Sequence, residues 1–194
     1  MPDTANTSLK VCTRASILMG GSPISSFTEG TAEADVCEAM YEDIARSALV
    51  NSRWGFATAQ AALSRLTDAP TARFDAAYQL PSAALTVSAL TVNDAAVTFD
   101  TYGDKVYCNV SEAQTVVADY IYRADEADWP PYFTVAVEYS VASMLATSIA
   151  RDPTLSQLLD QKAQIHMMQA RRLDSQRQTT QKLNTSRFIA ERRS

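Results

Sequence analysis

The feature that most constrains this chain is a nearly uninterrupted apolar segment from Tyr132 to Ala150, in which Glu138 is the only charged residue. A helix that is apolar all round is typical of the buried centre of a bundle. Asp128-Trp129-Pro130-Pro131 precedes the segment, and proline is tolerated in a first turn. The most apolar part of the segment, Val135 to Ala150, is interrupted by Glu138 and falls short of the roughly 20 apolar residues of a membrane span. We therefore expect a core helix over about 130–151 and no contact with a membrane.

Apolar periodicity and capping residues indicate three further helices. We expect them over about 4–18, 31–50 and 153–182. Thr31 provides an N-cap for the second helix, and Asp152-Pro153 combines a cap with proline at the first helical position of the last one. The apolar side of that last helix fades into a polar and basic end, so we expect it to project beyond its own core.

Between the second and third helices, over about 54–123, short β-prone stretches replace the helical pattern. Polar and apolar residues alternate from Val97 to Thr101 and again from Val106 to Val110, and the intervening Tyr102-Gly103-Asp104 is typical of a hairpin turn. The sequence therefore predicts an α+β fold. Its body, over about 1–178, would be mainly an α-helical bundle with an inserted antiparallel β-sheet, followed by an extended C-terminal helix and tail.

The chain lacks the residue patterns of most enzymes. Its single histidine, His166, has no carboxylate or metal ligand three or four positions away on its helix. The nucleophile-elbow, zinc-protease, P-loop and dinucleotide-binding motifs are all absent. The odd number and wide spacing of Cys12, Cys37 and Cys108 argue against a disulfide framework and a zinc site, so we expect three independent buried thiols. We therefore expect no catalytic, cofactor-binding or metal-binding residues and no enzymatic activity.

Two groups of side chains leave alternatives open. Asp125, Glu126 and Asp128 would suit a hard cation or a carboxylate-dependent hydrolase, whereas acidic residues before a helix are also common as caps. Four aromatic residues are candidates either for core packing or for anchoring a subunit interface. They are Trp54, Phe56, Trp129 and Tyr132.

Charge is distributed unevenly along the chain, whose formal net charge is -5. Residues 171–194 contain seven basic and two acidic residues, whereas residues 1–170 contain 10 basic and 20 acidic ones. An acidic body is unsuited to coating nucleic acid, and a basic tail is typical of a segment that binds a partner.

The end of that tail alternates arginines with apolar side chains. This composition is typical of a segment that docks into an acidic groove of a protein partner. The docking residues that we predict, on a docking arm over 179–194, are Arg187, Phe188, Ile189, Arg192 and Arg193. The alternative is a nucleic-acid-binding module in which the same arginines contact phosphates, and a solvated tail without function is the third interpretation.

Several short motifs follow one another in a characteristic order. They are Ile17-Leu18-Met19-Gly20-Gly21-Ser22-Pro23-Ile24-Ser25-Ser26-Phe27, a helix from Thr31, Trp54-Gly55-Phe56-Ala57, Tyr78-Gln79-Leu80-Pro81, the Tyr102-Gly103 hairpin, Trp129-Pro130-Pro131 and a long basic final helix. In this order, the chain resembles the head–tail adaptors of tailed bacteriophages, in the group similar to tail tubular protein A, over nearly its whole length. Ser22 departs from the family, in which an acidic residue commonly follows the second glycine.

That resemblance implies a structural virion protein: a helical bundle with an antiparallel β insertion, of which about a dozen copies form a ring beneath the capsid portal. The family's C-terminal segment reaches toward the portal protein, here residues 179–194, and tail or nozzle proteins bind the opposite side of the ring. DNA passes through the channel without specific binding, and an acidic body suits such a channel because it repels phosphate. The expected location is the head–tail junction of the virion, after assembly in the host cytoplasm, with no cofactor.

Overall fold

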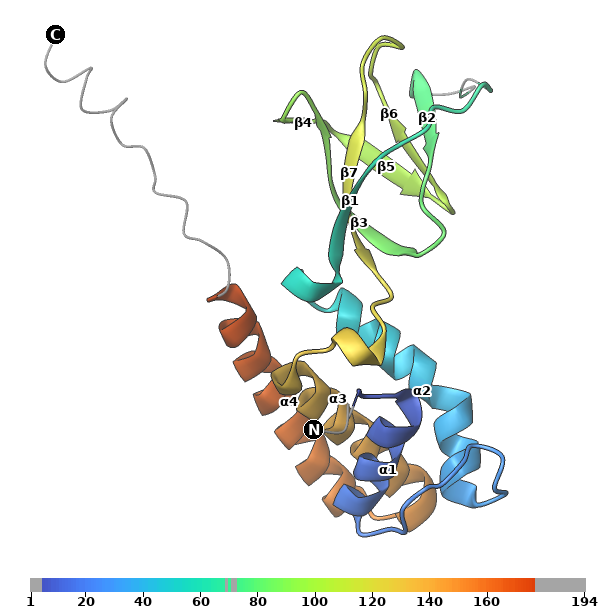
Figure 1. Ribbon diagram of the computed structural model, residues 1–194, viewed down its shortest axis with the longest axis vertical. Coiled ribbons are helices and arrows are strands. Elements are labelled where there is room, and N and C mark those ends of the chain that lie inside the picture. Colours follow the sequence, from blue (N-terminus) through green and yellow to red (C-terminus); the bar gives the residue numbers. More distant parts are fainter. Residues whose placement is uncertain (1–4, 69, 71–72, 177–194) are drawn as a thin grey trace, which may run out of the picture.

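The computed structural model describes residues 5–68, 70 and 73–176 and has an α+β fold, as predicted (Figure 1). In these residues, four α-helices form a bundle at one end of an elongated molecule, and seven short strands form a β region at the other end. The chain enters the β region after the second helix and leaves it before the third, so the β region is an insertion in the bundle.

Local capping sets the bounds of the first two helices. α1 spans Ser8–Met19 and starts later than predicted, because the Thr7 side chain caps it by accepting a hydrogen bond from the Lys10 N–H. It ends at Gly20, whose φ of 92° is the left-handed conformation that favours glycine after a helix. α2 spans Ala32–Val50 and follows the predicted cap, Thr31.

The last two helices are joined by a short turn. α3 spans Pro131–Leu145 and continues as a π-helix, η3, over Ala146–Ala150, so the predicted helix over 130–151 changes its winding near its end. α4 spans Pro153–Ser175, and the predicted cap, Asp152, accepts hydrogen bonds from N–H groups of its first turn. The part of the predicted helix from 177 to 182 lies outside the described residues.

α3 is the central helix of the bundle. It packs against α1, α2 and α4, and Phe133, Val137, Val141 and Leu145 are fully buried. By length and hydropathy alone, Pro131–Ala150 is long and apolar enough to cross a membrane, which corrects the expectation that it falls short. In the fold, packing against the three other helices covers much of this apolar surface, as in a core helix.

The β region contains two antiparallel sheets rather than the single sheet predicted over 54–123. One sheet has the strand order β1 (Thr58–Ala62), β7 (Val117–Tyr122), β3 (Ala84–Val92) and β4 (Ala95–Ala96). The other has the order β2 (Ala76–Gln79), β6 (Lys105–Cys108) and β5 (Phe99–Tyr102). Buried residues of both sheets, such as Tyr78, Leu90 and Val106, form one shared core. Each sheet thus buries one face against the other sheet. The alternating sequence pattern is compatible with two packed sheets as well as with a single sheet.

Two turns of the β region differ in how well the sequence predicted them. Tyr102-Gly103-Asp104 forms the predicted hairpin between β5 and β6, with a φ of 62° at Gly103. The β-prone region was expected to begin at about residue 54, but Gly55–Ala57 is a 3-10 turn, η1, in which the Trp54 carbonyl accepts a hydrogen bond from the Ala57 N–H. A second such turn, η2 (Glu126–Asp128), precedes α3.

The three cysteines are buried and free, but two of them are not independent. Cys12 of α1 and Cys37 of α2 share a thiol–thiol hydrogen bond in the core of the bundle, which corrects the expectation of three separate thiols. This hydrogen bond and burial raise the pKa of Cys12. Cys108 lies apart, in the core of the β region, where burial raises the pKa of its thiol. Spacing along the chain could not indicate the first pair, because helix packing creates the contact.

Candidate partner-binding surfaces

The predicted docking residues Arg187, Phe188, Ile189, Arg192 and Arg193 lie outside the described residues, but the base of their segment is described. Asp174, in the last turn of α4, is buried, although it is an acidic residue within a basic segment. Its Oδ2 atom accepts a hydrogen bond from the Gly55 N–H at 2.8 Å, and its Oδ1 atom accepts one from the Tyr132 hydroxyl at 2.9 Å. The end of α4 is therefore fastened to η1 and to the first turn of α3, at the junction of bundle and β region.

The predicted site residues do not include Asp174, because it lies within the basic segment 171–194. A signal was present in the spacing of the buried side chains of α4. Leu159, Ala163, Met167, Ala170 and Asp174 recur every three or four positions and are all buried. A carboxylate that continues such a stripe faces the core, where it needs hydrogen-bond donors.

The aromatic candidates lie at the junction, where three of them surround a fifth ring, that of Phe133. Trp54, Phe56 and Trp129 each have their ring centroid 5.0 Å from that of Phe133. Both tryptophans are buried, and Phe56 and Tyr132 are half-buried. Both indole N–H groups are satisfied inside the protein, by the Ala48 and Ala124 carbonyls at 3.0 Å. These rings thus form the core of the junction.

Of the three acidic candidates, one is engaged in hydrogen bonds within the protein and two are exposed to solvent. Glu126 accepts hydrogen bonds from Arg123 and from the Tyr41 hydroxyl, whereas Asp125 and Asp128 are exposed. Arg123 also pairs with Glu42 of α2 at 3.0 Å. Burial disfavours the Arg123 cation, but its hydrogen bonds with Glu42 and Glu126 outweigh burial and raise its pKa. Among the described residues, no group of three or more His, Cys, Asp or Glu side chains could hold a metal ion.

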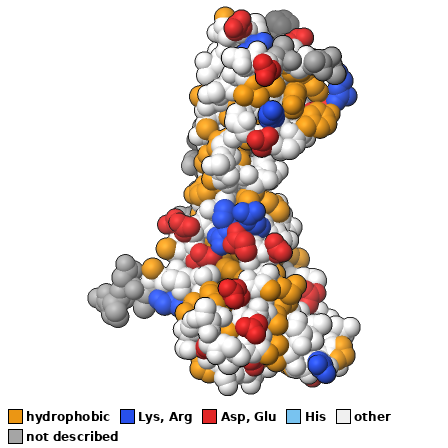
Figure 2. Space-filling model, turned by 90° about the vertical axis from the view of Figure 1, so that its right-hand side faces the viewer, with side chains coloured by type: hydrophobic (Ala, Val, Ile, Leu, Met, Phe, Trp, Pro, Cys, Tyr) orange, Lys and Arg blue, Asp and Glu red, His pale blue; other side chains and the backbone are white. Residues whose placement is uncertain are grey.

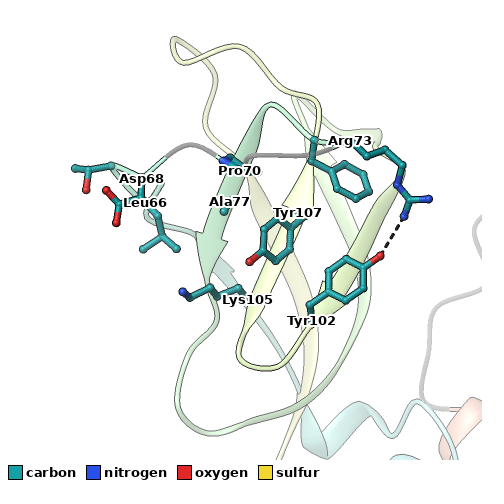
Figure 3. A pocket seen from close by; sticks show the side chains of 10 residues that line it. Leu66, Asp68, Pro70, Arg73, Ala77, Tyr102, Lys105 and Tyr107 are labelled. Carbon is teal, nitrogen blue, oxygen red and sulfur yellow. Dashed lines mark hydrogen bonds between the residues drawn. The ribbon is translucent and has the colours of Figure 1, made fainter.

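A pocket of about 650 Å³ lies on the outer surface of the smaller sheet of the β region (Figure 3). Leu66, Asp68 and Pro70 lie on one side of it, and the Tyr107 and Tyr102 rings lie on the other. Figure 2 shows hydrophobic side chains with Lys and Arg side chains beside them on the β region. An aromatic wall with polar groups at its border is typical of a surface that binds a ligand or a partner side chain.

The polar groups of this pocket differ in how strongly they are engaged. Arg73 is held by an ion pair with Asp100 and by a hydrogen bond to the Tyr102 hydroxyl at 3.1 Å, drawn as a dashed line in Figure 3. Its guanidinium also lies 4.9 Å from the centroid of the Phe74 ring. Lys105, by contrast, makes no ion pair or hydrogen bond through its side chain with any described residue. Lys105 is therefore the cation of the pocket that is available to an incoming acidic group.

No family model and no curated protein matches this chain.

Proposed function

We propose that this protein is a structural adaptor of a tailed-phage virion, whose ring joins the capsid portal to the tail and lets DNA pass. The observation that carries the proposal is the attachment of the basic segment. Asp174 fastens the end of α4 to Gly55 and Tyr132, so the docking arm starts from a fixed point on the body. An arm with a fixed origin can place a docking sequence on a second protein while the body remains available for other contacts.

The charge of the body supports the same function. Residues 1–170 contain twice as many acidic as basic residues, so the body as a whole repels phosphate. A subunit that lines a DNA channel needs this property, because a channel wall that bound DNA would retard its passage. A module that grips nucleic acid with its folded part would instead need a basic face there.

The elongated shape supports contacts with two different partners. The bundle and the far end of the β region are separated by the aromatic junction (Figure 1). We assign the aromatic pocket with Lys105, on the smaller sheet of the β region, to a tail or nozzle protein, and the arm over 179–194 to the portal. The portal-binding contact then includes Arg187, Phe188 and Ile189 as its apolar and cationic anchors.

Deletion of residues 179–194 tests the proposal. We expect the truncated protein to keep the circular dichroism and unfolding midpoint of the full chain, because every described contact of α4 is retained. We expect it to lose binding to its portal in a sedimentation assay. A matched variant, Arg192→Lys with Arg193→Lys, keeps the charge and should retain most of the binding.

Two outcomes would contradict the proposal. Normal association of the truncated protein with portals would show that the arm does not dock there. Binding of the full-length protein to DNA that weakens steeply with salt and disappears on truncation, without portal binding, would favour the nucleic-acid-binding module instead.

A further inference from the structure

α4 presents apolar side chains to solvent on the side away from the bundle core. Leu158, Ile165 and Met168 are 48%, 48% and 59% exposed. Together with Gln161 and Arg172 they recur at alternating steps of three and four residues, so they form one stripe along the helix. A stripe of this spacing is typical of a helix that packs against another helix, and none of the described elements covers this one.

α2 presents a second stripe with the same spacing. Val36, Met40, Asp43, Ser47 and Val50 recur at alternating steps of four and three residues, and Met40 and Val50 are 45% and 43% exposed. α2 and α4 both pack on α3 but lie on opposite sides of the bundle, so the two stripes face away from each other (Figure 1). One subunit therefore has two unpartnered helix faces that point in different directions.

The two helices also carry complementary charge. α2 contains five acidic residues and one arginine, and Asp35, Glu38 and Asp43 form no ion pair with any described residue. Figure 2, which views the side on which α2 lies in Figure 1, shows Asp and Glu side chains around hydrophobic ones on the bundle. α4 contains three basic and two acidic residues, and one of the acidic ones, Asp174, is buried. Arg172 and Lys162, on the exposed side of α4, also form no ion pair with a described residue.

From these observations we infer that the α4 stripe of one copy packs against the α2 stripe of a second copy of this chain. The contact joins two different faces, so each subunit still has one free face after binding and further copies can add. Apolar side chains meet in the centre, and the acidic residues of α2 meet the basic residues of α4 at the border. Closure of the series into a ring rests on the proposed function, but the contact itself does not.

Two face variants and their mixture test this interface. Ile165→Asp with Met168→Asp places acids on the α4 stripe, where they would meet the acidic α2. Met40→Arg with Val50→Arg places cations on the α2 stripe, where they would meet the basic α4. Gln157→Asp with Gln164→Asp is the matched control, because both glutamines are exposed on α4 but lie off the stripe. Each protein is measured alone by sedimentation velocity and light scattering at concentrations up to about 1 mM.

We expect the wild type and the control to form species larger than a dimer, and each face variant to associate at least about 100-fold more weakly. An equimolar mixture of the two face variants should recover a heterodimer, because the α2 stripe of the first variant and the α4 stripe of the second are both intact. A wild type that stays monomeric, a face variant that assembles normally, or a mixture without heterodimer would each overturn the inference. Unchanged circular dichroism shows that the variants are folded.

The adaptor proposal can fail separately from this inference. Head-to-tail assembly without portal binding would contradict the adaptor function and leave the interface intact. Portal binding by the wild type, together with face variants that assemble as the wild type does, would overturn the interface and leave the docking arm intact.

Discussion

Replacement of Asp174 by alanine is expected to weaken the fold at the point where the basic segment leaves the body. The side chain is buried and accepts hydrogen bonds at 2.8 Å from the Gly55 N–H and at 2.9 Å from the Tyr132 hydroxyl. Hydrogen bonds to a charged group each contribute about 1.5–3 kcal/mol. Gly55 itself is exposed, so water can replace part of that hydrogen bond in the variant. The expected loss in the free energy of unfolding is therefore about 3 kcal/mol.

Urea unfolding followed by tryptophan fluorescence measures this loss directly, because Trp54 and Trp129 lie in the junction core. For a chain of this size, the expected loss lowers the urea midpoint by about 1 M or more. Asp160→Ala is the matched control on the same helix, since Asp160 is exposed and its carboxylate accepts a hydrogen bond only from Gln164 among the described residues. We expect the control to change stability by less than about 0.5 kcal/mol. Equal midpoints for the Asp174 and Asp160 variants would refute the assignment of Asp174 as the anchor.

Three further predictions concern other parts of the molecule. Burial raises the pKa of Glu138 despite its ion pair with Arg14 at 3.0 Å, so the stability that Glu138 contributes is present below its ordinary pKa and is lost as pH rises. We therefore expect Arg14→Ala to lower the free energy of unfolding by about 1–2 kcal/mol near pH 7 and by clearly less near pH 4. Equal losses in urea unfolding at both pH values would contradict this. Hydrogen bonds from the Ser25 hydroxyl and, after it, from the Thr31 hydroxyl and backbone N–H groups lower the pKa of Glu29 to about 2. Ser25→Ala should therefore raise that pKa part of the way toward its usual range in an NMR titration, and an unchanged value would show that the Ser25 hydroxyl does not make this hydrogen bond in solution. Tyr102→Ala in the pocket should reduce capture of the proposed tail partner at least about 10-fold in a pull-down, without changing the assembly of the protein alone. Undiminished capture would show that the partner binds another surface.

The helical part of the fold could be predicted because its signals are local. The apolar segment that becomes α3, the cap at Thr31 and the cap at Asp152 each act within one or two turns of the chain. The hairpin at Gly103 is equally local, since it depends on one residue with positive φ. Alternation of polar and apolar residues predicted the strands, but it could not show whether they form one sheet or two. A strand with one apolar face fits both arrangements.

At the junction, the sequence indicated some of the residues involved but not which of them are in contact. Trp54, Phe56, Trp129 and Tyr132 stood out as large aromatic residues, but the sequence did not show that the rings of Trp54, Phe56 and Trp129 meet around Phe133. Asp174 meets Gly55 across 119 positions of the chain, and no local pattern encodes that contact. The pocket likewise combines a loop before β2 with β5 and β6, and it exists only once those strands are paired.

Electron microscopy of the protein mixed with its portal is the decisive test of the proposal that this protein joins a portal to a tail as a ring. We expect a ring stacked coaxially on the portal, with the arm over 179–194 in contact with the portal and the neighbouring subunits joined through α4 and α2. Dispersed monomers beside unoccupied portals, with the protein present in excess, would contradict it.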